Sequence, residues 1–405
     1  MEKFIARQPI FDQMQRVIGY ELLFRSDLDN YCKAVDMTLA SSTVISDSLS
    51  IFGIDQLTNG KRAFINLCRE SLLSGVTALL PRNGVTIEII ETVEPDEAVI
   101  DACRRLKAEG FRIALDDFVD RPEMRPLLEL ADYIKIDVLV TPVDELARVT
   151  ARLLQAFPQT WLLAEKVETR EVFDRCAKLG LSLFQGYFFA RPTIISGRDI
   201  SGAKLNYLRL LRDIAGTQYD IGRVEQILKS DVSIAYKLLR YVNSAAFGVR
   251  NRVTSLREAV VLLGQDQVRN LAALWAMAGL GKDSPEALLA LSVTRGRFCE
   301  VLAPLAGLDA NQPELFLLGM FSVIDAMVGR PMADIVSQLP ISEPVRAGLA
   351  DATGPLRPVL DCVIAYEQGD WARVAAFATA HGVDADAIPA LYVDAVSVTS
   401  SLTAA

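Results

Sequence analysis

Polar side chains lie within, end or follow the short apolar runs in the first half of the chain. They are carboxylates, amides and one lysine: Glu21, Asn66, Glu88, Asp116, Asp117, Lys135, Glu165 and Gln185. Oxygen ligands without histidine suit Mg²⁺ or Mn²⁺ better than zinc. Two such ions about 3.5–4 Å apart are a common apparatus for hydrolysing phosphodiesters. We therefore expect metal-dependent chemistry on a phosphate ester, with the lysine orienting the attacking water or offsetting developing charge.

Each of these residues also has an ordinary structural alternative. A single Asp or Glu at the end of a strand often caps the helix that follows, and Asp117 could do so. Glu91, Glu94 and Glu97 fit the solvated first turn of a helix. Unrelated helix caps do not explain why every one of these strand ends carries a coordinating group, and this recurrence favours a site.

Seven short apolar runs predict the strands that would carry these residues. They cover residues 17–24, 62–67, 84–90, 111–115, 133–137, 161–165 and 181–186. Segments with helical spacing separate them, which is typical of a parallel sheet covered on both faces. A compact (βα)8 barrel fits best, and an open doubly wound sheet is the alternative. In such a barrel the carboxyl ends of the strands converge, so the polar residues would share one mouth.

The second half of the chain has a different pattern. From about residue 200, apolar residues recur three and four positions apart, which predicts a helical bundle. The last ten residues are small and uncharged, which favours a frayed end. We expect a barrel domain over residues 1–192, a linker over 193–202, an all-helical domain over 203–395 and a flexible tail over 396–405.

Composition excludes several classes of protein. The 405 residues include 42 basic and 51 acidic side chains, so the net charge is −9 and direct DNA binding is not expected. The start lacks the apolar run of a signal peptide, and no stretch is long enough to span a membrane, so we expect a cytoplasmic protein. The single histidine, His381, excludes metal centres that need two histidines from this chain.

The first half resembles a known family, the EAL-domain cyclic-di-GMP phosphodiesterases, over residues 4–192. RQPIFD resembles the family's opening QP motif, and GYELLFR resembles its E-A-L-x-R, with Leu22 in place of Ala. FINL, TIEIIE, ALDDF, YIKID, AEKVET and QGYFFARP then follow in the family's order. The resemblance implies an EAL-type, TIM-like α/β barrel that binds cyclic-di-GMP and hydrolyses it to linear pGpG with two Mg²⁺ or Mn²⁺ ions.

The resemblance also implies a role for each site residue. The metal ligands would be Glu21, Asn66, Glu88, Asp116, Asp117 and Glu165. The catalytic residues would be Glu21, Glu165, Lys135, which orients the water, and Gln185, which helps to hold it. The substrate would contact Gln8, Asn66 and, at a phosphate, Arg25. Glu91 and Glu168 would support mobile loops of the site.

Two departures from the family affect catalysis more than binding. The family's D-D-F-G-T-G loop is here DDFVDRP, so Val119 and Arg121 replace glycines that permit turns with positive φ. Lys166 replaces a glycine beside Glu165. The ligand set is complete while its support is altered, which leaves two hypotheses open. One is weak or conditional hydrolysis of cyclic-di-GMP, and the other is an inactive cyclic-di-GMP receptor or interaction scaffold.

The helical half resembles the HDOD domains, HD-like all-α domains that lack the metal ligands of HD hydrolases. The motifs are ILKSDVSIAYKLLRYVNSAAFG and VTSLREAVVLLGQDQVRNL, and Ser322 and Val323 stand where a hydrolase has His and Asp. Asn243 and Ser244 would either bond a helix end or face a partner protein. The order of the domains resembles the YuxH-type EAL–HDOD signalling proteins of bacteria. It implies a regulatory or partner-binding HDOD domain, an unidentified signalling partner, and a barrel that can form homodimers.

Overall fold

The computed structural model describes residues 4–25, 54–188, 238–243, 255–280, 285–339 and 341–403, together with 207, 208, 211 and 253. The chain divides into two compact units, residues 1–191 with 364–405, and residues 192–363. The predicted linker over 193–202 lies outside the described residues. Within the described residues, no helix combines the length and the apolar character needed to cross a bilayer.

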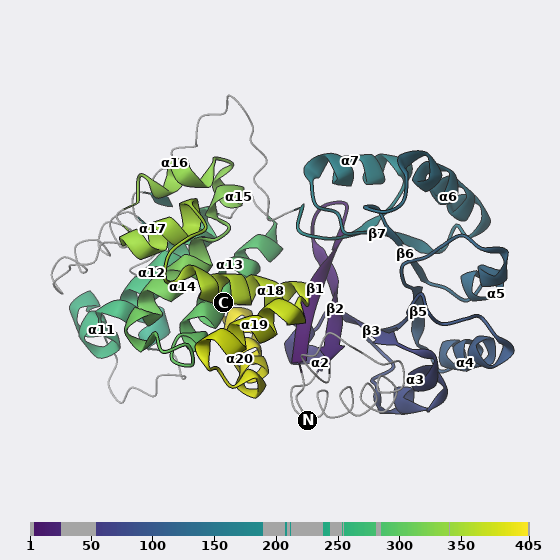
Figure 1. Ribbon diagram of the computed structural model, residues 1–405, viewed down its shortest axis with the longest axis horizontal. Coiled ribbons are helices and arrows are strands. Elements are labelled where there is room, and N and C mark those ends of the chain that lie inside the picture. The colour runs from purple at the N-terminus through teal and green to yellow at the C-terminus, as the bar shows by residue number, and fades with distance from the viewer. Residues whose placement is uncertain are drawn as a thin grey trace. The chain divides into compact units, whose positions relative to one another are not determined.

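The first unit contains a closed barrel of eight strands in chain order (Figure 1). The strands are β1 (Phe4–Asp12), β2 (Val17–Arg25), β3 (Arg62–Leu67), β4 (Val85–Ile89), β5 (Arg112–Leu115), β6 (Tyr133–Asp137), β7 (Trp161–Glu165) and β8 (Leu183–Gln185). Outside them lie α2 (Ile54–Thr58), α3 (Arg69–Leu73), α4 (Glu97–Ala108), α5 (Arg125–Leu128), α6 (Val143–Ala156) and α7 (Arg170–Leu179). The barrel interior is packed with Ile10, Phe64, Ala114, Tyr133, Leu163 and Leu183. The predicted TIM-like barrel is confirmed.

The first strand differs from the prediction of a purely parallel barrel. β1 runs antiparallel to both β2 and β8, and a tight turn, without a helix, joins it to β2. The Asp12 side chain builds this turn by accepting hydrogen bonds from the amides of Met14 and Arg16, both at 2.9 Å. The segment was not predicted as a strand because it contains Pro9, which lacks an amide donor, among polar residues.

Local signals set the ends of the outer helices. Asp96 precedes α4 and accepts a hydrogen bond from the Val99 amide, and Thr169 does the same for α7 through the Val172 amide. Gly180 ends α7 with φ of 99°, a left-handed conformation that glycine adopts without steric cost. The two N-terminal caps fix where α4 and α7 begin after the strands β4 and β7.

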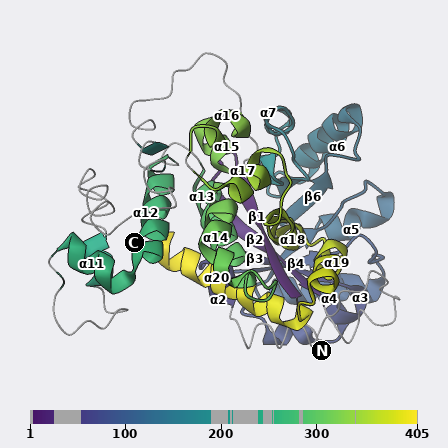
Figure 2. The ribbon, with the colours of Figure 1, turned by 60° about the vertical axis from the view of Figure 1, so that its left-hand side comes forward.

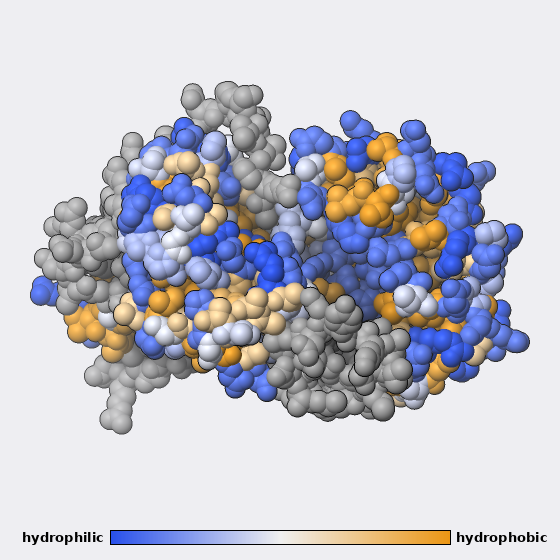
Figure 3. Space-filling model, in the orientation of Figure 1, coloured by the Kyte–Doolittle hydropathy of each residue, from blue (hydrophilic) through white to orange (hydrophobic). Residues whose placement is uncertain are grey.

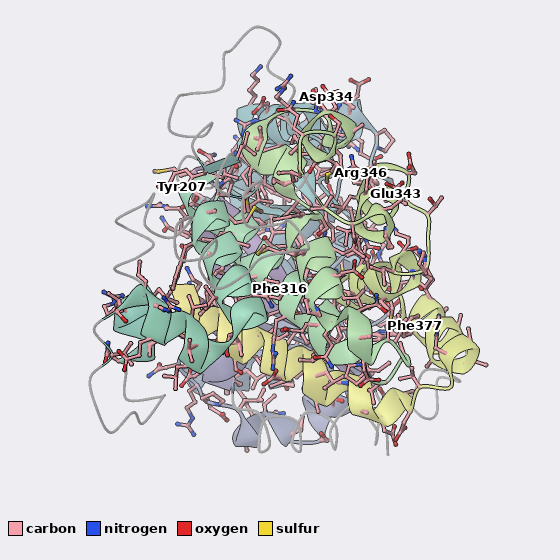
Figure 4. All side chains as sticks on the ribbon, turned by 90° about the vertical axis from the view of Figure 1, so that its left-hand side faces the viewer. Tyr207, Phe316, Asp334, Glu343, Arg346 and Phe377 are labelled. Carbon is pink, nitrogen blue, oxygen red and sulfur yellow. The ribbon has the colours of Figure 1, made fainter. Side chains whose placement is uncertain are left out.

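The second unit is helical in all of its described elements, which confirms the prediction of an all-α domain. They are α11 (Leu256–Leu263), α12 (Gln265–Leu280), α13 (Glu286–Leu302), α14 (Gln312–Phe321), α15 (Ile324–Val328), α16 (Met332–Val336), α17 (Glu343–Ala350) and the start of α18 (Arg357–Gln368). Helices α13 and α14 meet at their backbones, because a Cβ on Gly319 would lie 2.4 Å from the carbonyl oxygen of Arg295. On α17, Arg346 pairs with Glu343 one turn away (Figure 4).

The end of the chain belongs to the barrel unit, which differs from the predicted helical domain over 203–395. Residues 364–405 group with the barrel and contain α19 (Trp371–His381) and α20 (Ile388–Thr403). Helix α20 lies against α2 and β1 (Figure 2). The flexible tail predicted over 396–405 is therefore wrong for 396–403. The residues of this tail are small, but the helical spacing of apolar residues, three and four positions apart, continues through α20 into it. The side chains at these spaced positions are buried: Tyr392, Ala395, Val396 and Thr399.

Candidate phosphodiester-hydrolysis site

Strands β2 to β7 run parallel, so their carboxyl ends share one mouth of the barrel. Strand register aligns the predicted site residues: Asn66 on β3 pairs with Glu88 on β4, and Gln8 on β1 pairs with Glu21 on β2. Partners directly opposite each other in a sheet point to the same face. The polar residues that the sequence placed at strand ends therefore converge inside the barrel.

Lys135 lies at the centre of this convergence and is completely buried. Its Nζ contacts four carboxylates: Asp116 at 2.7 Å, Glu165 at 2.9 Å, Glu88 at 3.0 Å and Glu21 at 3.1 Å. One ammonium cannot neutralise four buried carboxylates, so the cluster carries an excess of negative charge. Such a charge is costly in a buried site unless further cations enter or protons bind.

Glu21 is held by amides as well as by the lysine. Its Oε1 accepts a hydrogen bond from Asn66 Nδ2 at 2.7 Å, and its Oε2 accepts one from Gln185 Nε2 at 2.7 Å. The same Gln185 nitrogen lies 2.9 Å from Gln8 Oε1. Side chains on β3, β6 and β8 thus bond Glu21 directly, and Gln8 on β1 acts on it only through Gln185.

The pKa values in the cluster are pushed apart. Burial raises the pKa of Glu88 well above its usual range, and the charge of Glu21 adds to the effect against the opposing charge of Lys135. Burial likewise raises the pKa of Asp116, and raises that of Glu165 to about 8. Burial would also raise the pKa of Glu21, but Lys135 and the hydrogen bonds from the two amides outweigh it and lower the pKa.

The donor chemistry of the cluster fits divalent cations. Five buried oxygens have no hydrogen-bond donor among the described residues: Asn66 Oδ1, Glu88 Oε2, Asp117 Oδ1, Glu165 Oε2 and Gln185 Oε1. Four of them belong to predicted metal ligands, and hard oxygen donors are what Mg²⁺ and Mn²⁺ bind. In the described part of the chain, no three acidic, histidine or cysteine side chains already form a metal cage. Lys135 stands between the carboxylates, so metal binding requires side chains to turn from it.

Asp117 lies at the rim of the cluster, beside a lysine. Its φ is 38°, and that of Lys166 is 55°, so both adopt the left-handed region that glycine tolerates best. Lys166 Nζ lies 3.6 Å from Asp117 Oδ1 and also contacts Asp137. Asp137 is buried at the end of β6 and was not predicted as a site residue. The sequence motif YIKID could have indicated it: Asp137 follows Lys135 by two residues, and side chains two residues apart in a strand point to the same side.

Two predicted residues lie outside the cluster, and a third falls outside the described side chains. The Arg25 side chain is not among the described side chains, although β2 ends at this residue. Glu91 and Glu168 are exposed on the loops that follow β4 and β7. Their predicted roles, and the roles of the clustered residues, remain predictions.

Polar residues of the helical unit make structural hydrogen bonds. The Asn243 side chain donates to the carbonyl oxygens of Leu239 and Val253 at 2.7 and 2.8 Å and accepts from the Val253 amide. This is the helix-end role that the sequence offered as one alternative; Ser244 lies outside the described residues. Ser322 accepts from Arg295 Nη1 at 3.1 Å and donates to the Gly319 carbonyl at 2.7 Å.

Sequence comparison identifies the same two domains. The EAL domain model matches residues 4–192, and the HDOD domain model matches residues 205–332. The cyclic di-GMP phosphodiesterase CdgJ of Vibrio cholerae is 34% identical over 373 residues, which are 92% of this chain and 86% of CdgJ. The uncharacterized protein YuxH of Bacillus subtilis is 33% identical over 382 residues, 92% of each chain.

Structure comparison finds similar barrels. The PaMucR phosphodiesterase in complex with c-di-GMP covers 47% of this chain and 97% of its own, with 22% identity and a TM-score of 0.40. A likeness of this size carries no argument about the site.

Proposed function

Because the chain belongs to the family of proteins that join an EAL domain to an HDOD domain, we propose that its barrel binds cyclic-di-GMP and hydrolyses it weakly or conditionally to linear pGpG. The observation that carries this proposal is the cluster around Lys135. Its carboxylates point into one barrel mouth, and their unpaired buried oxygens call for divalent cations. The name of the relative CdgJ supports the same substrate.

Electrostatics make metal ions necessary for binding as well as for chemistry. The phosphodiester groups of cyclic-di-GMP are negative, and ionised carboxylates of the cluster would repel them unless a cation neutralises the charge. Glu21, Asn66, Glu88, Asp116, Asp117 and Glu165 would hold two Mg²⁺ or Mn²⁺ ions. Such ions, when bound, neutralise the phosphate and lower the pKa of a water molecule.

The chain's own residues supply orientation and charge. Asn66 and Gln185 hold the Glu21 carboxylate from two sides, which keeps this ligand in one position. The Lys135 ammonium stays charged because its four carboxylate neighbours raise its pKa despite burial. It can therefore orient the attacking water through a donated hydrogen bond and offset the negative charge that develops on the phosphate.

The contact between Lys166 and Asp117 favours weak or conditional turnover. An ammonium beside a predicted ligand competes with a cation for the same oxygen, so the second ion is held loosely. The second candidate function, an inactive cyclic-di-GMP receptor, rests on this same contact. Incubation with cyclic-di-GMP and Mn²⁺, with chromatographic detection of pGpG, separates the two. Product formation supports hydrolysis, whereas binding in calorimetry without product supports the receptor.

The remaining properties follow from the family and from the surface. The HDOD domain is regulatory and binds an unidentified signalling protein, in a cytoplasmic setting and without direct contact to DNA.

Hydrophobic patches interrupt the hydrophilic surface of the barrel unit (Figure 3). After β6, Leu139, Val140 and Val143 are largely exposed, and they are candidates for the interface of a homodimer. Light scattering of the V140D variant and the unchanged protein tests this interface.

A further inference from the structure

The hairpin of β1 and β2 has an inner face in the site and an outer face under the C-terminal helices. Gln8 and Glu21 are opposite each other and point into the barrel, where both bond Gln185. Side chains alternate along a strand, so the preceding residues, Arg7 and Tyr20, point outward. Both are buried, and the Arg7 guanidinium lies over the Tyr20 ring, 4.5 Å from its centroid.

The segment that covers this outer face comes from the far end of the chain. β8 pairs with β1 only over Ile10–Asp12, so the preceding part of β1 needs another neighbour on that edge. Helix α20 lies against this strand and against α2, and Arg7 Nη1 donates to the Leu57 carbonyl of α2 at 2.6 Å. At Gly369, between α18 and α19, an added Cβ would lie 3.2 Å from Leu23 Cδ1 on β2.

Tyr392 on α20 joins the covering helices to β1. Its side chain is buried, and the Arg7 backbone amide donates a hydrogen bond to its hydroxyl. Its ring lies 4.9 Å from that of Tyr366, and the charges of Arg7 and Glu367 both act on it. Burial raises the pKa of Tyr392 to about 12, so the hydroxyl stays protonated.

We propose that residues 364–403 brace the outside of the barrel at β1 and that Tyr392 is a positioning residue for Gln8 and Glu21. The segment lies beyond the match to the HDOD domain, which ends at residue 332. A strand held on its outer face cannot slide or rotate on its inner face, because both faces belong to one backbone. Tyr392 fixes the backbone at Arg7, and the next residue, Gln8, helps to hold Glu21 through Gln185.

Helix α18 carries Tyr366, so a movement of this helix reaches the ring contact with Tyr392. Helix α18 (Arg357–Gln368) is continuous across the boundary between the units at residues 363 and 364. A partner protein that displaces α18 would disturb Tyr366, and through it Tyr392, without contact to any site residue. The effect on metal binding rests on the proposed function, whereas the effect on β1 does not.

The test compares three variants of the full chain. Y392F removes the hydroxyl and keeps the ring, and Y392A removes both. F377A is the matched control, because Phe377 is a buried aromatic residue of the same segment that packs on His381 within α19 (Figure 4). Deuterium exchange of the amides of residues 5–8, without ligand, reports the opening of β1. Titration with Mn²⁺ reports the Glu21 site.

We expect amide exchange at residues 5–8 to be about fivefold faster in Y392F, which is the change in rate that the loss of one hydrogen bond produces. It should be faster still in Y392A. F377A should leave it unchanged. Mn²⁺ affinity should fall in the Tyr392 variants, and any lost activity should return at high Mn²⁺, which a general folding defect would not allow. Unchanged exchange in both Tyr392 variants, or equal acceleration in F377A, overturns the inference. If the unchanged protein binds no cyclic-di-GMP with Mn²⁺, the proposed function fails while the exchange data still decide the role of Tyr392.

Discussion

The ammonium of Lys166 lies 3.6 Å from Oδ1 of Asp117, and both residues have positive φ angles. Neither residue is a glycine, so each holds a backbone conformation that costs about 1 kcal/mol or more. The resemblance to the EAL family places glycine at the position of Lys166, where this conformation carries no such cost. The chain thus has an internal cation beside a carboxylate predicted to bind a metal ion.

Replacing Lys166 with glycine should tighten the second metal site. The K166G variant removes the competing ammonium and relaxes the backbone, so a second Mn²⁺ should bind more tightly and kcat should rise about tenfold or more. Electron paramagnetic resonance of Mn²⁺ and product formation measure the two effects. K166Q is the control, because it removes the charge and keeps the Cβ. Equal Mn²⁺ binding in K166G and the unchanged protein would show that Lys166 does not compete.

Replacing Val119–Arg121 with Gly-Thr-Gly should raise turnover more than affinity. Asp120 pairs with Arg152, and Arg121 lies 3.8 Å from Glu94, in exposed pairs worth at most about 1 kcal/mol each. Their loss leaves the fold intact, while the glycines let the loop after Asp117 adopt positive φ. The effect should appear in kcat, because the loop positions groups for the transition state. Fast hydrolysis by the unchanged protein, slowed by the swap, would show that the loop without glycines is a working variant.

The E21Q variant should remain folded, and its turnover should fall at least about 10²-fold, below the limit of detection. The substitution removes the charge of one metal ligand. It also replaces the carboxylate that accepts hydrogen bonds from Asn66 and Gln185 with an amide, which has only one acceptor oxygen. Lys135 keeps three carboxylate neighbours, so the cluster survives. Calorimetry with cyclic-di-GMP at millimolar Mn²⁺ should still detect binding by the unchanged protein. Absence of binding there would refute the site, and full activity of E21Q would refute the role of Glu21.

The sequence predicted the site residues, because their positions depend on where the strands end. It did not predict the features that depend on contacts between distant segments. Parallel strands must converge, so the position of Lys135 among Glu21, Glu88 and Glu165 followed from strand order. The antiparallel direction of β1 did not, because Pro9 and polar residues hide its alternation. The contact of Tyr392 with Arg7 joins residues 385 positions apart, from 7 to 392, and depends on tertiary packing that no local pattern records.

Adding a Cβ at Gly369 should weaken the cover over the hairpin. Gly369 has φ of 70°, and its Cβ would lie 3.2 Å from Leu23 Cδ1, so G369A combines backbone strain with a tight contact. We expect a loss of about 1–2 kcal/mol in the free energy of unfolding. G382A is the control, because Gly382 has similar φ and nothing near its Cβ. Denaturant unfolding should show the larger loss of stability in G369A. Equal losses in the two variants would mean that backbone strain alone explains them and that the contact with Leu23 contributes nothing.

The helical unit should not hydrolyse phosphate esters. A two-metal HD centre needs histidine ligands, and the one histidine of the chain, His381, lies in the barrel unit. Ser322, at the position of a hydrolase histidine, instead bonds Arg295 and the Gly319 carbonyl, so S322A should lower stability by about 1 kcal/mol. The full chain carrying E21Q should therefore show no metal-dependent phosphohydrolase activity, measured with cyclic-di-GMP, pGpG and a chromogenic phosphodiester. An activity in E21Q that disappears in the E21Q/S322A double variant would place a second hydrolytic centre in the helical unit.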